Sequence, residues 1–230
     1  MKKLLTVLLL LLGSAAWGGD FEDAGTAYDK KDYATAIVKY RISADQGHKG
    51  SQLMLGAMYG NGLGVKKDNK KAARWYKLAA LQGDSFAKTN LGVMYENGEG
   101  VVQDYTEAVK WYKLAVVDGV YRAQLNLGTL YLNGKGVTQD YAEAMRLYKL
   151  VAQYDNEEAQ FYIGSMYNNG QGVVEDYVQA HKWYNLSSVS GYKNAARLRD
   201  ILEEKMTPQQ ISKAQKLAKQ CQERNFKNCD

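Results

Sequence analysis

The stretch GNGLGV, residues 60–65, decides the fold of this chain because it returns three times at a spacing of 36 residues. The later copies are ENGEGV (96–101), LNGKGV (132–137) and NNGQGV (168–173). A glycine-rich stretch followed by lysines first indicates a phosphate-binding loop, but such a loop joins a strand to a helix. Here each copy lies between two expected helices. We therefore interpret it as a turn whose first glycine, Gly62 in the first copy, ends a helix in the left-handed conformation.

Each repeat contains two helical patterns, called the A helix and the B helix below. The A helix has one apolar face, formed in the second copy by Ala87, Leu91, Met94 and Tyr95. The B helix follows an aspartate that can accept hydrogen bonds from free backbone N–H groups, and it buries a small residue with an aromatic pair. These aspartates are Asp68, Asp104, Asp140 and Asp176. Tandem helix pairs at a constant period predict an all-α solenoid of 36-residue helix-turn-helix repeats.

Residues 1–18 have the features of a secretory signal peptide: two lysines, an apolar run and a small-residue cleavage site that ends near Gly18. The run is too short to span a bilayer. Cleavage would lower the formal net charge from +5 to +3, which is too weak a balance to indicate nucleic-acid binding. We expect a periplasmic or secreted protein without a membrane span.

The repeat pattern predicts the organisation of the mature chain. A shortened first unit at 20–47 lacks the glycine loop, four full units occupy about 48–191, and a further helix covers 194–206. The solenoid thus extends over 19–206. Residues 207–230 form a capping helix and a tail, in which Thr207 is the helix cap, Pro208 the first helical residue and Gln210 the partner of the cap.

The segment from Ala87 to Ala115 carries the pattern A-x-x-x-L-G-x-M-Y-x-x-G-x-G-V-x-x-D-Y-x-x-A-x-x-W-Y-x-x-A. This pattern resembles the Sel-one-like repeat family, a branch of the tetratricopeptide-repeat superfamily, over nearly all of the mature chain. The resemblance implies a right-handed α-superhelix that acts as a scaffold or adaptor for protein complexes. Exported bacterial members are similar in role, often in envelope signalling, polysaccharide export or host contact.

By analogy with the family, the A-helix positions turned away from the buried face line a concave groove that could hold a peptide. The alternative is that these side chains pack against the neighbouring repeat. The candidates are Leu53, Thr89, Val93, Leu125, Thr129, Phe161 and Ser165.

Basic side chains recur in phase on the B helices and predict a ridge on the outer side. An anionic partner is conceivable, but a solvated helix face is the better interpretation because Glu107 and Glu143 are spaced to pair with two of them. The ridge residues are Arg74, Lys77, Lys110, Lys113, Arg146, Lys149 and Lys182.

The two cysteines of the chain, Cys221 and Cys229, are close in sequence and would pair in an oxidising compartment. Their spacing is too wide for a C-x-x-C redox motif, and two ligands are too few for zinc. We expect a structural disulfide that holds the tail against the capping helix.

Signals of catalysis are weak. Ser85 with Lys88 and Ser190 with Lys193 match the S-x-x-K pattern of penicillin-recognising enzymes, but the accompanying S-D-N and K-T-G motifs are missing. Both matches fall where an A helix begins, so a capping role for the serine is simpler. The two histidines, His48 and His181, have no acidic or cysteine cluster around them in the sequence, and we expect no metal, cofactor or catalytic residue.

The sequence therefore predicts an exported adaptor that binds another polypeptide and assembles or regulates an envelope or secreted complex. One alternative is a peptidoglycan- or β-lactam-directed enzyme or penicillin-binding protein. Another is a glycan-binding module, for which exposed aromatic residues along the groove are expected and only Phe161 qualifies. The partner and the oligomeric state do not follow from the residues.

Overall fold

The computed structural model describes residues 19–229, so the predicted signal peptide lies outside the described residues. Within this range every regular element is a helix, as the sequence predicts. Residues 19–29 are helical. The further helices are α2 (Tyr33–Asp45), α3 (Lys49–Asn61), α4 (Asn69–Leu81), α5 (Ser85–Asn97), α6 (Tyr105–Val116), α7 (Tyr121–Asn133), α8 (Tyr141–Ala152), α9 (Glu157–Asn169), α10 (Tyr177–Val189), α11 (Lys193–Glu203) and α12 (Pro208–Glu223).

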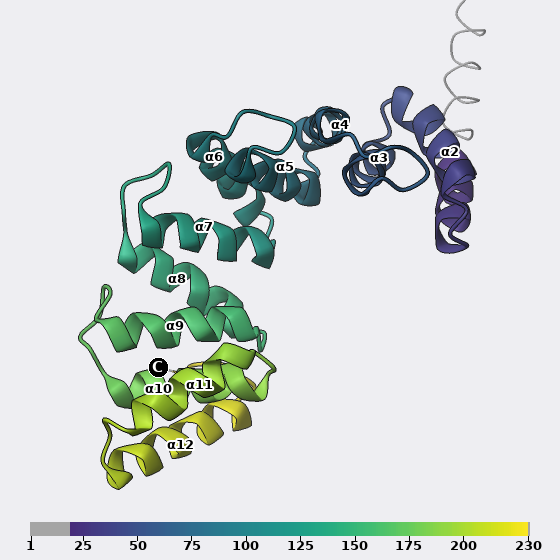
Figure 1. The fold of residues 1–230 in the computed structure, drawn as a ribbon. Coiled ribbons are helices and arrows are strands. Elements are labelled where there is room, and N and C mark those ends of the chain that lie inside the picture. Colours follow the sequence, from purple (N-terminus) through teal and green to yellow (C-terminus); the bar gives the residue numbers. More distant parts are fainter. Residues whose placement is uncertain (1–18, 230) are drawn as a thin grey trace, which may run out of the picture. The chain divides into compact units, whose positions relative to one another are not determined.

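The chain divides into two compact units, the first ending at Val120 and the second beginning at Tyr121. In the first unit each helix from α2 to α6 packs against the next one along the chain. In the second unit α7 to α10 pack in the same successive manner, and α10 also contacts α11 and α12 (Figure 1). Successive packing of helix pairs is the architecture that the 36-residue period predicts, and the all-α solenoid fold is confirmed.

The predicted helix starts are confirmed at the aspartates. Asp68, Asp104, Asp140 and Asp176 each accept a hydrogen bond from a backbone N–H in the first turn of a B helix. The carboxylates of Glu107 and Glu143, however, pair with Lys110 and Arg146, at 3.1 Å and 2.7 Å. These are the surface ion pairs that the spacing of the two acidic residues predicts.

A glycine in each A helix allows the B helix of the same repeat to approach closely. A Cβ atom added at Gly56 would lie 2.5 Å from a ring carbon of Tyr76, and one at Gly92 would lie 2.5 Å from Tyr112. The tyrosine of the aromatic pair thus packs within its own repeat, and Tyr148 also stacks on Tyr162 of the next repeat, with ring centroids 4.8 Å apart. The tyrosine ring packs on the glycine of its own repeat, because only a residue without a side chain leaves room for it.

The second glycine of the turn lies against the preceding repeat, as Gly64 and Gly100 show. At Gly100 an added Cβ would lie 2.2 Å from the carbonyl oxygen of Asn69, and at Gly64 it would lie 2.3 Å from that of Tyr33. Asn69 and Tyr33 are the first residues of α4 and α2, the B helices of the preceding repeats. The turn therefore docks its backbone directly on the neighbouring repeat.

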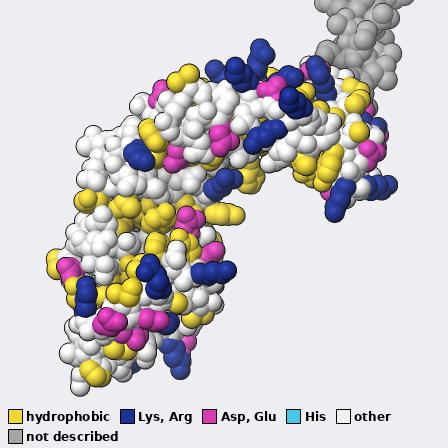
Figure 2. All heavy atoms as spheres, in the orientation of Figure 1, with side chains coloured by type: hydrophobic (Ala, Val, Ile, Leu, Met, Phe, Trp, Pro, Cys, Tyr) yellow, Lys and Arg dark blue, Asp and Glu magenta, His cyan; other side chains and the backbone are white. Residues whose placement is uncertain are grey.

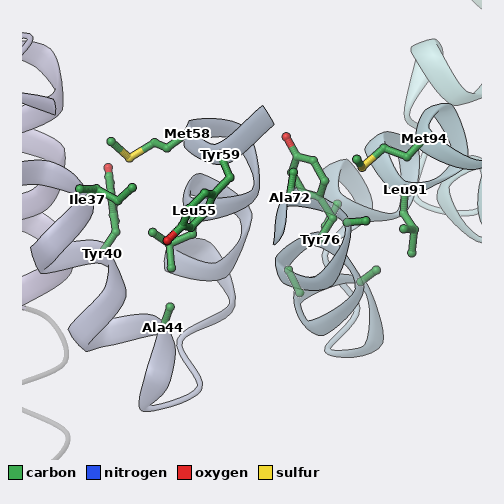
Figure 3. Close-up of a cluster of buried hydrophobic side chains, with 14 of the residues drawn as sticks. Ile37, Tyr40, Ala44, Leu55, Met58, Tyr59, Ala72, Tyr76, Leu91 and Met94 are labelled. Carbon is green, nitrogen blue, oxygen red and sulfur yellow. The ribbon is translucent and has the colours of Figure 1, made fainter. Parts of the chain in front are cut away.

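The core of the first unit is a continuous cluster of side chains between successive helices. Ile37 and Tyr40 of α2 face Leu55 and Met58 of α3 (Figure 3). The same cluster continues through Ala72 and Tyr76 of α4 to Leu91 and Met94 of α5. Because each helix buries side chains against the helices before and after it, removing one large core side chain weakens two contacts at once.

The end of the second unit differs slightly from the sequence prediction. Helix α11 ends at Glu203, three residues before the expected end at Met206, and the chain turns there. Helix α12 then begins at Pro208 with the predicted capping box between Thr207 and Gln210. Ala214, Ala218 and Cys221 form its buried face, which lies against α10.

Candidate functional site

The groove candidates of the A helices are largely packed against the fold. Thr89 and Leu125 expose only 2% and 6% of their surface, so the prediction that these two side chains are available to a partner is wrong. The remaining candidates are half-buried: Leu53, Val93, Thr129, Phe161 and Ser165. Position on a helical wheel does not separate a free face from one that a neighbouring helix covers.

Contacts within the fold account for most of these side chains. The Thr89 hydroxyl donates to the carbonyl of Ser85 at 2.9 Å, and the Thr129 hydroxyl lies 3.1 Å from that of Tyr148. Phe161 packs on the rings of Tyr184 and Tyr192, with centroids 5.8 Å and 4.6 Å apart. Burial raises the pKa of the Tyr184 phenol above its ordinary value, and a hydrogen bond with Ser165 offsets part of this rise. Thr89 and Thr129 are therefore held by contacts within their own repeat, Leu125 belongs to the core cluster of the second unit, and Phe161 packs on its own repeat and on Tyr192 beyond it.

The basic ridge is exposed over most of its length. Arg74, Lys77, Lys110, Lys113 and Arg146 are exposed and Lys149 is half-buried. In Figure 2, Lys and Arg side chains gather over the region of α4. The prediction is wrong for Lys182, which exposes 2% of its surface because the C-terminal tail covers it. Its Nζ donates to the carbonyl of Cys229 and lies 4.7 Å from the centroid of the Trp183 ring.

A pocket between α2 and α4 brings two ridge positions together with aromatic side chains. It encloses about 350 Å³. Arg41 comes from α2, Tyr59 from α3, and the remaining lining residues from α4. The α4 residues are Lys71, Arg74, Trp75 and Leu78. The lining combines a tryptophan and a tyrosine with three basic groups and no acidic group.

A second pocket repeats the first one 36 residues later. It encloses about 500 Å³ between α4 and α6. Every lining residue of the first pocket has its equivalent here, namely Lys77, Tyr95, Glu107, Lys110, Trp111 and Leu114. Helix α4 therefore contributes to both pockets, Arg74 to the first and Lys77 to the second.

The basic groups of the two pockets differ in how far they are neutralised. Lys71 Nζ lies 3.4 Å from the Asp68 carboxylate and 5.3 Å from the centroid of the Tyr59 ring. The hydrogen bond from the Lys71 backbone N–H lowers the pKa of Asp68, so this carboxylate is ionised at neutral pH. Within residues 19–229, neither Arg74 nor Lys77 has an ion-pair partner. These two cations of α4 are thus available to an anionic group.

The corresponding cavity of the second unit is partly filled by the tail. It encloses about 260 Å³ and is lined on one side by Lys149, Ala152, Gln153 and Trp183, the equivalents of Lys77, Ala80, Leu81 and Trp111. Phe226, Asn228 and Cys229 of the tail line the other side. Lys182, which the tail buries, is the equivalent of Lys110. The tail thus covers a position that is exposed in the preceding repeats.

The tail is a tight turn rather than an extended segment. Asn225, Phe226 and Asn228 have positive φ angles, and the Phe226 backbone N–H donates to the carbonyl of Cys221 at 3.0 Å. The Cα atoms of Cys221 and Cys229 are 5.1 Å apart, with their sulfur atoms paired. Oxidation of this pair in the exported protein stays a prediction.

We expect Cys229→Ser to lower the free energy of unfolding by roughly 2–3 kcal/mol, because the unfolded chain loses its cross-link. Release of the tail should also make Lys182 more reactive toward acetylation. Denaturant titration and mass spectrometry of acetylated lysines measure the two effects. Lys216, exposed on α12, is the internal control and should react equally in both proteins. Free thiols in the untreated parent protein would contradict the disulfide.

The residues considered for catalysis have structural partners. Asp84, not Ser85, caps α5, and Lys88 pairs with Asp118 at 2.8 Å. The Nδ1 atom of His48 accepts from the backbone of Ser51 and caps α3. His181 is fully buried, with its Nε2 2.7 Å from Glu203 Oε1. The described residues contain no cluster of three His, Cys, Asp or Glu side chains suited to a metal, and no helix among them is long and apolar enough to cross a membrane.

Sequence reasoning missed the aromatic part of this site, although a signal for it was present. Trp75 and Trp111 recur beside the ridge residues Arg74 and Lys110 at the same 36-residue spacing. An aromatic residue next to an exposed cation, repeated in phase, indicates a recurrent pocket as well as a recurrent core position. The helical periodicity by itself indicates only a core position for these tryptophans.

Comparison with known proteins agrees with the fold. A family model described as Sel1 repeat matches residues 50–84, 85–116, 122–153 and 157–188, more than half of the chain. The chain therefore belongs to the Sel1 repeat family, whose members are generally non-catalytic scaffolds for protein–protein interaction. A search of curated proteins finds no match.

Several solved structures are similar. A Sel1 repeat protein from Oxalobacter formigenes is 32% identical, with a TM-score of 0.72 over 78% of this chain and 74% of its own. A protective antigen of uropathogenic Escherichia coli with an SLR fold is 28% identical, with a TM-score of 0.60 over 94% of this chain. The match spans 55% of that antigen. An immunity protein from Pseudomonas aeruginosa, 19% identical over 90% of this chain and 82% of its own, with a TM-score of 0.50, shows the fold alone.

Proposed function

We propose that this protein is an exported adaptor that binds another polypeptide and thereby assembles or regulates an envelope or secreted complex. The observation that carries the proposal is the recurrence of one pocket type in two successive repeats of the first unit. Tryptophan, tyrosine and arginine are the residues that most often dominate binding energy at protein interfaces. A surface that repeats a tryptophan and a tyrosine beside basic side chains at constant spacing is suited to hold a polypeptide at more than one point.

Export is supported by the signal-peptide features of residues 1–18, and it would place the adjacent side chains of Cys221 and Cys229 in an oxidising compartment. N-terminal sequencing of the protein recovered from the periplasm or the medium is expected to begin at Gly19. A protein recovered only from the cytoplasm with Met1 in place would contradict this part of the proposal.

The enzyme alternative gains no support from the site geometry. Catalysis by an S-x-x-K pair requires the lysine beside the serine hydroxyl, whereas Lys88 pairs with Asp118 at 2.8 Å. Ser190 donates to Asp155 at 2.6 Å. Lys88 and Ser190 thus each have an aspartate partner outside the S-x-x-K pair.

To test the adaptor proposal, residues 19–230 are immobilised and used to capture proteins from an envelope extract. Any captured polypeptide is then purified and mixed with the mature chain to measure binding. We expect one polypeptide to be retained and then to bind saturably in the reconstituted mixture. The matched control is an unrelated exported protein of similar charge on the same matrix. Failure to retain any polypeptide beyond that control would overturn the proposal.

A further inference from the structure

The tail of the second unit shows what kind of group one of these cavities accepts. Phe226 belongs to the apolar cluster that contains Trp183, so an aromatic side chain lies among the residues around that tryptophan. The carbonyl oxygen of Cys229 accepts a hydrogen bond from Lys182. The occupant therefore supplies two features, an aromatic ring for the apolar part and an oxygen acceptor for the cation.

The pockets of the first unit contain the same partners without a comparable covering. Arg74 and Lys110 stand at the position of Lys182 and are exposed, whereas Lys182 is buried. Leu78 and Leu114, which line the two pockets, expose 46% and 44% of their surface. The buried Lys182 donates to a carbonyl oxygen of the tail, whereas the equivalent cations of the first unit are exposed. This difference indicates that the open pockets can take an oxygen acceptor from outside the chain.

The charges of the residues that line the two pockets indicate the charge of the polypeptide segment that they can bind. Among the cations that line the first pocket, Arg41 and Lys71 pair with Asp45 and Asp68, and in the second pocket Lys88 and Lys110 pair with Asp118 and Glu107. Within residues 19–229, Arg74 in the first pocket and Lys77 in the second have no ion-pair partner, so these two cations of α4 can attract an acidic segment. Carboxylates form stronger hydrogen bonds to such groups than neutral carbonyls do. Aromatic rings pack favourably against tryptophan and tyrosine.

We infer that the Trp75 and Trp111 pockets of the first unit together bind an acidic segment of a partner polypeptide that carries aromatic side chains. One aromatic ring enters each pocket, and carboxylates of the segment contact the cations of α4. This inference rests on the proposed function, because the partner is a polypeptide. It adds the chemistry of the bound segment and its place at the two pockets between α2, α4 and α6.

The test uses a fluorescein-labelled peptide in which two phenylalanines are each flanked by aspartate and glutamate. Its two control peptides replace the acidic residues by lysine or the phenylalanines by alanine. We expect the acidic aromatic peptide to raise the fluorescence anisotropy saturably, with binding that weakens as salt is added. Neither control peptide should bind comparably. Equal binding of either control peptide would overturn the inference.

Charge reversal on α4 provides the site test. Arg74→Glu with Lys77→Glu changes two exposed residues, one in each pocket, and should weaken peptide binding about tenfold or more. Lys216→Glu with Lys219→Glu on α12 makes the same change at the same spacing on an exposed helix face. This control should retain parental affinity. Equal loss in both variants would mean general charge attraction and would overturn the inference.

The tryptophans localise the bound peptide independently of charge. The mature chain contains Trp75, Trp111 and Trp183, so its nitrogen–proton NMR spectrum should show three indole signals, assigned by single Trp→Phe changes. Titration of the acidic aromatic peptide should shift the signals of Trp75 and Trp111 and leave that of Trp183 in place, since the tail lines its cavity. Shifts at Trp183 alone would overturn the inference.

The two proposals fail in different ways. If a purified partner binds the parent and the α4 charge-reversal variant equally well, the adaptor function stands and the pocket inference is wrong. If the acidic aromatic peptide binds at the pockets but no polypeptide is captured from the extract, the pocket chemistry stands and the adaptor proposal fails.

Discussion

Trp111→Ala is expected to lower the free energy of unfolding by about 3–5 kcal/mol. The indole exposes 6% of its surface and lies in the cluster that extends through the first unit from the helix at 19–29 to α6. Its removal takes away the transfer free energy of a large ring and leaves a cavity between α4 and α6 that the neighbouring helices close only in part. Denaturant titration followed by far-ultraviolet circular dichroism measures the change.

Trp75→Ala is the matched control for this prediction. Trp75 holds the equivalent position 36 residues earlier but is only half-buried, so the same change should cost clearly less. Repeats contact only their neighbours, and either effect should remain concentrated in the first unit. A loss below about 1 kcal/mol for Trp111→Ala would contradict its buried position in the fold.

Gly56→Ala is expected to destabilise the protein by about 3 kcal/mol, at the upper end of what overpacking costs. Alanine normally stabilises a helix interior relative to glycine by roughly 0.5–1 kcal/mol. At this position the added Cβ would lie 2.5 Å from the Tyr76 ring, which is itself buried between α3 and α4. Separation of the two helices or rotation of the ring would lose more packing energy than the helix gains.

Gly60→Ala in the same helix is the control, and its expected effect on the free energy of unfolding is opposite to that of Gly56→Ala. Its added Cβ would meet its nearest neighbour, the Cβ of Ala72, at 3.7 Å, an ordinary contact. We therefore expect Gly60→Ala to stabilise the protein by about 0.5–1 kcal/mol. Both values come from denaturant titrations under identical conditions. A stabilised Gly56→Ala protein would show that α3 and α4 do not approach as closely as their contact requires.

The candidate site could be predicted only in part from the sequence. The basic positions Arg74, Lys77 and Lys110 are exposed and line the pockets, and their phase is visible in the sequence alone. For the groove positions Thr89 and Leu125 the sequence leaves open a free face or a packed one, and both side chains are buried. A helical wheel does not indicate which sides of a helix its neighbours cover.

What the sequence by itself determined is the local structure and the period of the repeat. Asp104 caps α6 through its neighbours in the first turn, Gly98 ends α5 in the left-handed conformation, and Thr207 with Gln210 forms the capping box of α12. Each of these interactions joins residues within one helical turn. They depend only on residue type and spacing and can therefore be read from the chain.

Only the tertiary structure decided the environment of each recurring position, which differs from one repeat to the next. Lys182 occupies the repeat position of Lys110, yet it is buried because a carbonyl oxygen 47 residues later in the chain accepts its hydrogen bond. Gly100 is required by contact with Asn69 of the preceding repeat. Such contacts join segments that only packing brings together, so identical positions in the repeat acquire different environments and different roles.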